Sequence, residues 1–357
     1  MVLDSLFTPI SIGPLTLRNR FAMAPMTREK SPGGSPNAEN VDYYRQRAAG
    51  GVGLIITEGT FVRGPAAGSM AGVPHIYGDQ AQNWRGVIEA AHAEGAAIVP
   101  QLWHMGVARG RTPEFEPELE SVSPSGVTGS GKPLGRALTA DDIDTVIANY
   151  VESAALAKDL GFDGIELHGA HGYLLDQFFW EQTNLREDRF GGDLQQRTTF
   201  PAEVVAAVRE AVGTQFPVIY RFSQWKGSDY DAKIATSATE LETLLGPLVD
   251  AGVDVFHSST RRHWLPEFEG EAAGIGLAGW TKKVTGRPVI TVGSVGVDSV
   301  FLGGEIDQEQ LNRFDVLSEQ FDRGEFDIVA VGRALLADPQ WVNKIHDGRL
   351  SEITPFR

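Results

Sequence analysis

The 357-residue sequence predicts a single (β/α)8 TIM barrel over residues 1–357, with an N-terminal β-hairpin and a long loop after the third strand. Three observations indicate this fold class. Eight short apolar runs recur along the chain, and stretches with helical spacing separate most of them, as in parallel strands joined by crossover helices. No G-x-G-x-x-G motif follows the first run, which argues against a doubly wound dinucleotide-binding sheet.

The eight apolar runs are the expected barrel strands. Most are apolar without interruption, as is typical of strands buried on both faces of a parallel sheet. In chain order they are RFAMAP (20–25), GLIITEG (53–59), AIVPQLW (97–103), GIELHG (164–169), PVIYRFS (217–223), VDVFHSS (253–259), PVITVGS (288–294) and FDIVAVGR (326–333).

Stretches with helical spacing predict the crossover helices. The boundaries are clearest in 139–160, because Thr139 is a candidate N-cap before acidic residues and Gly161 follows the last turn. The stretches lie at 80–94, 139–160, 195–212, 235–251 and 334–346.

Three further segments are expected outside this alternation. The run ISIGPLTLRN places two β-like stretches around Gly13-Pro14 and predicts a small hairpin before the barrel. Segment 106–136 is rich in Pro, Gly and Ser and predicts a long loop after the third strand, on the face where barrel enzymes carry their active sites. Segment 295–326 predicts a long acidic connection before the last strand.

Composition narrows the function classes. The formal net charge of −16 argues against a nucleic-acid partner and favours a small ligand, because nucleic-acid binding depends on Lys and Arg. The absence of cysteine excludes disulfides, thiolate zinc sites, cysteine-ligated iron–sulfur clusters and a cysteine nucleophile. We expect no membrane span and no secretory signal, and therefore a cytoplasmic protein. The sequence leaves open whether the protein forms a homo-oligomer.

Residues at the carboxyl ends of the predicted strands are mostly hydrogen-bond donors. Glu58 is the one carboxylate among them, so a two-carboxylate glycosidase or an acidic magnesium site has little support. Donors suit an electron-rich ligand with several carbonyls and a phosphate, for which glycines after strands seven and eight predict a binding site. The set comprises Ala24, Pro25, Met26, Thr27, Glu58, Gly59, Gln101, Trp103, His104, His168, His171, Tyr173, Arg221, Gly293, Ser294, Gly332 and Arg333.

Several blocks carry a resemblance to a known family. The longest is FDGIELHGAHGYLLDQFFWEQTNLREDRFGGDLQQR (162–197), and others are LTLRNRFAMAPMT (15–27), GLIITEG (53–59), PQLWHMG (100–106), YRFS (220–223) and VAVGRALLADP (329–339). Over nearly its whole length the sequence resembles the Old Yellow Enzyme family of FMN-dependent ene reductases. The resemblance implies bound FMN, NADH or NADPH as reductant, and hydride transfer to the C=C bond of a small activated alkene, an α,β-unsaturated carbonyl or nitro compound.

The resemblance also implies roles for single residues. His168 and His171 would bind the substrate's carbonyl oxygen, with His168 also beside the flavin, and Tyr173 would donate the proton. Trp103 would shape the substrate pocket. The flavin would be backed by Ala24, Pro25, Met26 and Thr27, contacted by Gly59 and Gln101, met by Arg221 at its N1/O2 side, and held at its phosphate by Gly293, Ser294, Gly332 and Arg333.

Other interpretations of these residues stay open at this point. The H-x-x-H pair His168/His171 would also suit a metal-dependent barrel hydrolase, with His104 or His257 as a third ligand. Arg221 could form an ion pair with Glu58 or Glu166, and Trp103 could serve packing alone. Within flavin chemistry, the alternative is an amine or N-methyl dehydrogenase that runs in the oxidative direction. From another class, the alternative is a non-catalytic flavin carrier. The arginines and glycines of REDRFGGD are expected only to order the segment after strand four.

Overall fold

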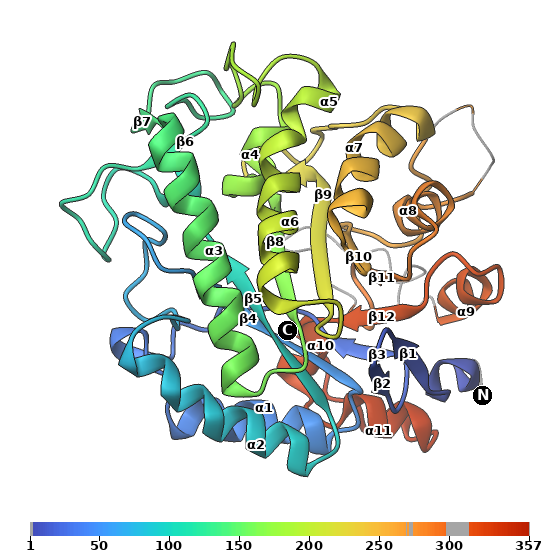
Figure 1. Cartoon of the computed structure of the whole chain (residues 1–357). Helices are drawn as coiled ribbons and strands as arrows, with labels where there is room; N and C mark the ends of the chain where they lie inside the picture. The colour runs from blue at the N-terminus through green and yellow to red at the C-terminus, as the bar shows by residue number, and fades with distance from the viewer. Residues whose placement is uncertain (1–2, 269, 271–273, 298–313, 357) are drawn as a thin grey trace.

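The computed structural model describes residues 3–268, 270, 274–297 and 314–356. Eight parallel strands close into a barrel in the order β10-β11-β12-β3-β4-β5-β8-β9 (Figure 1). Each lies within or overlaps one of the eight predicted runs, so the predicted TIM barrel is confirmed. The strands are β3 (Phe21–Met23), β4 (Leu54–Phe61), β5 (Ala97–Trp103), β8 (Ile165–His171), β9 (Val218–Lys226), β10 (Val255–Ser259), β11 (Val289–Val292) and β12 (Ile328–Val331).

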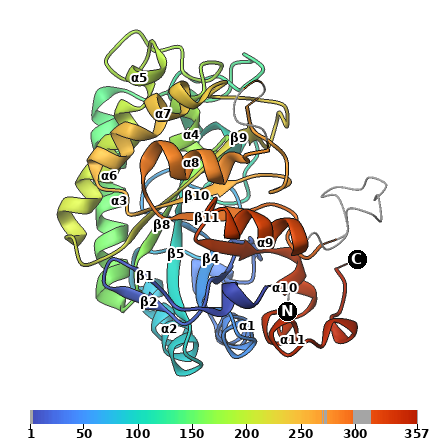
Figure 2. The ribbon, with the colours of Figure 1, turned by 90° about the vertical axis from the view of Figure 1, so that its right-hand side faces the viewer.

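Helices surround the barrel on its outside (Figures 1 and 2). The predicted 139–160 is α3, with a capping box between Thr139 and Asp142 and a left-handed Gly161 at its end. None of the described helices is long and apolar enough to cross a membrane. The main helices are α1 (Ala38–Ala49), α2 (Trp84–Ala93), α3 (Ala140–Leu160), α6 (Thr199–Val212), α7 (Ala238–Ala251), α8 (Leu277–Thr285) and α9 (Phe314–Asp322).

Two of the predicted helices are divided. The stretch 334–346 forms α10 (Arg333–Ala337) and α11 (Trp341–His346), because Asp338 precedes Pro339 and adopts an extended conformation. The stretch 195–212 likewise contains the end of α5 (Leu194–Arg197) before α6 begins. The periodicity therefore located helical segments but not their breaks.

The predicted hairpin closes one end of the barrel. Strands β1 (Ile10–Ile12) and β2 (Leu15–Leu17) pair antiparallel around Gly13, whose φ is 56°. Ile12 and Leu17 belong to the same buried cluster as residues of the barrel strands such as Leu54 and Ile219. The amino-terminal end is thus covered, which leaves the carboxyl ends of the strands for a site.

The two predicted long connections are described to different extents. Segment 106–136 is a loop that contains a 3-10 turn (Gly106–Arg109), a short parallel pair between β6 (Val122–Ser123) and β7 (Arg136–Ala137), and an isolated antiparallel bridge between Val127 and Pro133. Buried Arg109 orders this loop by donating to the carbonyls of Gly68 and Leu119. Of the acidic connection 295–326, residues 298–313 lie outside the described residues.

Candidate functional site

The turn after β8 brings His168, His171 and Tyr173 together. The His168 ring lies 5.1 Å from the His171 ring and 4.8 Å from the Tyr173 ring, centroid to centroid, both edge to face. Tyr173 precedes α4 (Leu174–Phe179) as its N-cap residue. Trp103 on β5 packs edge to face on Tyr173 at 4.9 Å, so the predicted pocket residue contacts the predicted proton donor.

A local irregularity of β8 directs these side chains. The register between β8 and β9 shifts between Gly169 and His171, and His171 has φ +64°, a left-handed value rarely adopted by a residue other than glycine. Gly172 follows with φ +86°. Bulges of this kind commonly redirect a side chain beside an active site.

Hydrogen bonds from β9, from the residue after it and from α4 hold this left-handed turn. The Ser223 hydroxyl accepts from the His171 backbone N–H at 2.9 Å, and the Gly227 N–H donates to the His171 carbonyl at 3.0 Å. The Gly172 N–H donates to Asp176 at 2.6 Å. Asp176 in turn pairs with Lys226 at 2.8 Å, with both side chains fully buried. The backbone around His171 is therefore fixed on both sides.

The charge states of the three residues suit hydrogen-bond donation. Burial, reinforced by the nearby Arg221 cation, holds the pKa of His168 and of His171 well below the usual range. Both imidazoles are therefore neutral at pH 7, each with one N–H. Burial raises the pKa of Tyr173, which keeps its phenol protonated.

A polar network lines the barrel interior near this turn. Glu166 accepts from the Gln101 amide at 2.8 Å and lies 2.6 Å from Nδ1 of His257. The Arg221 guanidinium donates to the Ser259 hydroxyl at 3.1 Å. Burial lowers the pKa of Arg221, and the Glu166 carboxylate opposes that effect. Glu166 is thus the acidic group that influences Arg221.

Glu58 has a different role from the one considered in the sequence. Its carboxylate accepts from the Arg28 backbone N–H at 2.8 Å and lies 3.4 Å from the Tyr44 hydroxyl, with no described bond to Arg221. It therefore ties the segment after β3 to α1. Burial raises the pKa of Glu58 to about 7.

Several buried polar atoms of the site have no hydrogen-bond partner among the described residues. They are Nδ1 of His168, Nε of Arg221, Nε1 of Trp103 and Nε2 of His257. Buried polar groups are normally satisfied by protein, water or ligand. Nε of Arg221 and Nε1 of Trp103 are donors, whereas Nε2 of His257 is an acceptor, because Nδ1 of this neutral histidine donates to Glu166. A ring system with acceptor and donor atoms, such as the isoalloxazine of FMN, fits this set.

The segment after β3 lies at the same end of the barrel. Ala24 is buried, Pro25 and Met26 are half-buried, and Thr27 is exposed. Gly332, at the end of β12, adjoins it, since a Cβ at this glycine would lie 3.5 Å from the Met26 sulfur. Gly59 packs so closely on Trp103 that a Cβ would lie 2.4 Å from its ring. Gly59 is therefore needed for packing, whatever else it contacts.

The predicted phosphate-binding residues lie at the ends of β11 and β12. Gly293 leaves no room for a Cβ, which would lie 2.3 Å from the Thr260 hydroxyl. The Ser294 hydroxyl donates to the Arg261 carbonyl at 2.8 Å, so this side chain already has a protein acceptor. Arg333 is half-buried at the start of α10, with its guanidinium 5.8 Å from the Phe356 ring centre. β11 and β12 are neighbours in the barrel, so these residues share one edge.

The metal interpretation has no support from the described part of the chain. No three His, Cys, Asp or Glu side chains there could hold a metal ion. His104 accepts the Gly106 N–H through Nδ1, and His257 is paired with Glu166. Each of the histidines weighed as a third ligand thus uses its Nδ1 within the protein.

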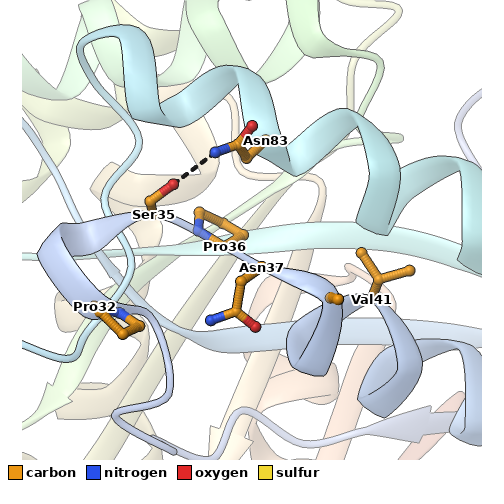
Figure 3. Close-up of a pocket in the computed structure, with 7 residues that line it drawn as sticks. Pro32, Ser35, Pro36, Asn37, Val41 and Asn83 are labelled. Carbon is orange, nitrogen blue, oxygen red and sulfur yellow. Dashed lines mark hydrogen bonds between the residues drawn. The ribbon is translucent and has the colours of Figure 1, made fainter.

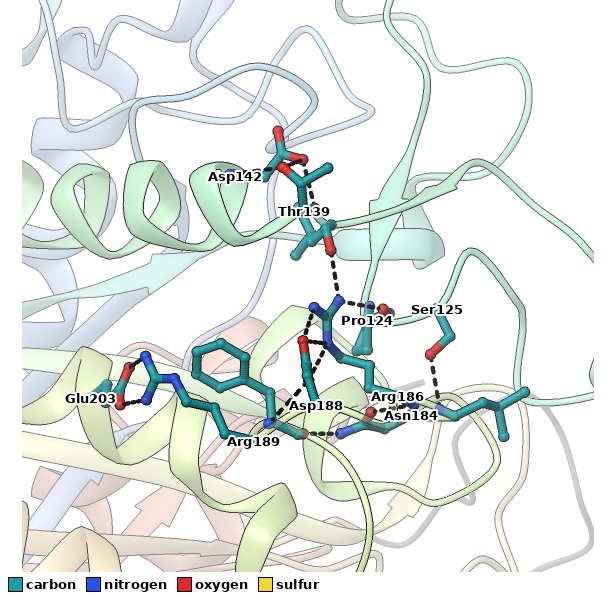
Figure 4. Close-up of polar contacts among 12 residues, drawn as sticks. Pro124, Ser125, Thr139, Asp142, Asn184, Arg186, Asp188, Arg189 and Glu203 are labelled. Carbon is teal, nitrogen blue, oxygen red and sulfur yellow. Dashed lines mark hydrogen bonds and ion pairs between the residues drawn. The ribbon is translucent and has the colours of Figure 1, made fainter.

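The segment after β8 is ordered as expected. Arg186 donates to the carbonyls of Pro124 and Leu138 and pairs with Asp188 (Figure 4). These bonds attach the REDRFGGD segment to the loop after β5.

A surface pocket lies apart from the predicted site. It is lined by Pro32, Ser35, Pro36, Asn37, Ala38, Val41 and Asn83, none of which is a predicted site residue (Figure 3).

Four residues of the site were not predicted from the sequence. Ser259 ends the sixth strand and was within reach of the rule that selected the other strand ends. Trp225 stacks on His171 at 4.3 Å, but β9 extends to Lys226, past the predicted end at 223. Asp176 and Lys226 gave no signal, because their pairing joins distant segments.

Comparison with known proteins places the chain in a family. The profile of the NADH:flavin oxidoreductase / NADH oxidase family matches residues 5–352. The chain is 37% identical to an NADH oxidase of Thermoanaerobacter brockii, over 98% of the chain and 52% of that protein. It is 34% identical to a chanoclavine-I aldehyde reductase of Penicillium roqueforti, over 97% of the chain and 90% of that protein.

Solved structures agree with these matches. Morphinone reductase in complex with tetrahydroNAD superposes with a TM-score of 0.78 at 30% identity, over 97% of this chain and 91% of that one. The Old Yellow Enzyme homologue of Zymomonas mobilis has a TM-score of 0.78 at 26% identity, over 97% and 93%. The chain spans about half the length of the T. brockii NADH oxidase and of a metal reductase of Desulforamulus reducens. It belongs to the NADH:flavin oxidoreductase / NADH oxidase family of FMN-dependent oxidoreductases, which includes the Old Yellow Enzymes.

Proposed function

We propose that this chain is an ene reductase: it binds FMN, accepts hydride from NADH or NADPH, and reduces the C=C bond of a small α,β-unsaturated carbonyl or nitro compound. The observation that carries the proposal is the cluster of His168, His171 and Tyr173, two neutral imidazoles and a protonated phenol whose ring centres lie 4.8 to 6.4 Å apart. Family membership supports the cofactor.

The residues that would hold FMN surround this cluster. Gln101 and Arg221 line the barrel interior beside it, and the unpartnered Nε of Arg221 is suited to an acceptor of the pyrimidine ring. The segment 24–27 would back the ring, and Gly293, Ser294, Gly332 and Arg333 would hold the phosphate. When bound, FMN supplies the hydride that the protein's own side chains cannot.

His168 and His171 would stabilise the charge that develops on the substrate. Hydride addition to the β-carbon leaves negative charge on the carbonyl or nitro oxygen. Two fixed N–H groups at that oxygen lower the barrier, and loss of one such donor typically costs about 10²–10³ in rate. The hydrogen bonds to Ser223 and Gly227 keep the His171 backbone in place for this task.

Tyr173 would protonate the α-carbon as a general acid. Its raised pKa keeps the proton on the phenol at neutral pH until charge develops nearby. Trp103 limits the motion of the Tyr173 ring by packing on it at 4.9 Å. Two reductases among the similar proteins, the chanoclavine-I aldehyde reductase of P. roqueforti and morphinone reductase, favour the reductive direction.

The proposal is tested with the purified protein. We expect an oxidised-flavin spectrum, FMN released on denaturation, and anaerobic NADH or NADPH oxidation that depends on cyclohexenone or a maleimide. A protein without FMN after reconstitution, or one that never oxidises NAD(P)H in the presence of these alkenes, contradicts it. Flavin reduction by an amine without NAD(P)H would instead indicate the dehydrogenase.

A further inference from the structure

Ser259, the last residue of β10, links Arg221 to His171. Its hydroxyl oxygen lies 3.1 Å from Nη2 of Arg221 and 2.8 Å from Nε2 of His171. The serine is 2% exposed, so water does not readily replace either contact. A guanidinium has no acceptor, so the hydroxyl oxygen accepts from Arg221.

The remaining hydrogen of this hydroxyl decides the state of His171. The neutral imidazole carries one N–H and one lone pair, and which nitrogen is protonated depends on what the other one contacts. If Nε2 presents its lone pair, the hydroxyl hydrogen has an acceptor. If Nε2 carries the hydrogen, the hydroxyl hydrogen has no acceptor among the described residues, and a buried unsatisfied donor is costly.

We propose that Ser259 fixes His171 in the tautomer protonated at Nδ1 and thereby acts as a positioning residue for the site. The Arg221 cation strengthens the effect, because a hydroxyl that accepts from a cation is a better donor. Nδ1 of His171 makes no hydrogen bond to the residues that the structure describes, so its N–H is left for a ligand.

The surroundings of the ring maintain this orientation. Trp225 stacks on the imidazole at 4.3 Å with an interplanar angle of 28°. The indole N–H of Trp225 donates to the Ser259 carbonyl at 3.1 Å. Ser259 therefore holds the edge of the imidazole through its hydroxyl, and the neighbour on its face through its carbonyl.

This inference rests on the proposed function only for its consequence: the Nδ1–H of His171 is the donor that meets the substrate oxygen. The tautomer itself is a property of the protein chain. It can be measured whether or not the chain reduces alkenes.

The direct test is 15N NMR of protein labelled at its eight histidines. The His171 signals are assigned by their loss in His171→Gln. In the wild-type protein we expect a protonated Nδ1 and a lone pair at Nε2, and in Ser259→Ala a larger share of the Nε2–H tautomer. Ser259→Thr, which keeps the hydroxyl, should restore the wild-type pattern.

The adjacent residue provides a matched control. Ser258 is also buried on β10, but its hydroxyl donates to Thr281 at 3.1 Å. Ser258→Ala should therefore leave the His171 signals unchanged. A wild-type His171 protonated at Nε2, or an unchanged tautomer in Ser259→Ala, overturns the proposal.

A binding measurement links the tautomer to the site. The probe is 4-hydroxybenzaldehyde, whose phenolate oxygen resembles the developing oxyanion, with affinity measured by calorimetry. We expect the dissociation constant to rise by about tenfold in Ser259→Ala, the effect of one lost hydrogen bond, and to be unchanged in Ser258→Ala. Equal affinities in both variants contradict the assigned donor role. Absence of FMN from the wild-type protein would refute the proposed function and leave the tautomer result standing.

Discussion

Replacing Lys226 by Met should destabilise the protein strongly, because it leaves a buried carboxylate without its cation. Nζ of Lys226 lies 2.8 Å from Asp176, and both side chains are fully buried. After the substitution, the one hydrogen bond that Asp176 keeps with described residues comes from the Gly172 N–H, 2.6 Å away. Breaking a buried pair in this way costs about 3–5 kcal/mol in the free energy of unfolding.

The double variant Lys226→Met/Asp176→Asn should cost less than the single one. It buries no charge, and an Asn oxygen still accepts from the Gly172 N–H, so we expect a loss of about 1–2 kcal/mol. The exposed pair of Arg63 and Glu152, 3.2 Å apart with side chains 53% and 48% exposed, gives the control. Arg63→Met should cost about 0–1 kcal/mol.

Urea denaturation of the four proteins at pH 7 and pH 5 measures these differences. The penalty of Lys226→Met should be smaller at pH 5. Burial raises the pKa of Asp176 and Lys226 opposes this, so without the lysine the carboxyl more readily takes up a proton. The reasoning is refuted if the double variant is less stable than Lys226→Met, or if Lys226→Met costs no more than Arg63→Met.

Three other substitutions test the site and its supports. Glu58→Gln should flatten the pH dependence of stability. In the folded wild-type protein the pKa of Glu58 is about 7, against an ordinary value of 4.5, so the folded state binds the proton more tightly than the unfolded state. The free energy of unfolding of the wild-type protein should therefore fall by about 3 kcal/mol as the pH rises from 4.5 to 7. Urea denaturation midpoints of the two proteins at pH 4.5 and pH 7 measure this pH dependence. An equal change with pH in the wild-type protein and in Glu58→Gln would contradict the prediction. Gly59→Ala should lower the free energy of unfolding, measured by urea denaturation, by about 1–3 kcal/mol, because its Cβ would lie 2.4 Å from the Trp103 ring. The control Gly86→Ala should not destabilise the protein, because this position is exposed on a helix and its Cβ would lie 3.6 Å from Val41. Equal effects of the two substitutions would contradict the packing argument. His168→Ala should keep FMN and lower kcat for alkene reduction by about 10²–10³ in steady-state assays, and retention of full activity would remove its role as a donor.

The barrel could be predicted because its strands are buried on both faces. Each strand appears as a separate apolar run, and Thr139 and Gly161 mark the ends of α3 by chemistry that acts within a few residues. What failed depended on geometry beyond the run itself. The extension of β9 to Lys226 depends on pairing with His171 across a register shift, which no local pattern contains.

The same distinction holds for the site. The selection of strand ends and the family resemblance located His168, His171 and Tyr173, which the structure brings together. Neither could show that Ser259 bridges Arg221 and His171, because the three residues come from three strands. The choice between Glu58 and Glu166 near Arg221 likewise needed the direction of each side chain.

The central claim is most directly tested by anaerobic stopped-flow measurement of the two half-reactions in the wild-type protein and in Tyr173→Phe. We expect NAD(P)H to reduce the flavin at similar rates in both proteins. Reoxidation by cyclohexenone should be at least about 10² slower in Tyr173→Phe, because the variant lacks the proton donor. Equal reoxidation rates in the two proteins, or a wild-type flavin that cyclohexenone does not reoxidise, would contradict the assignment.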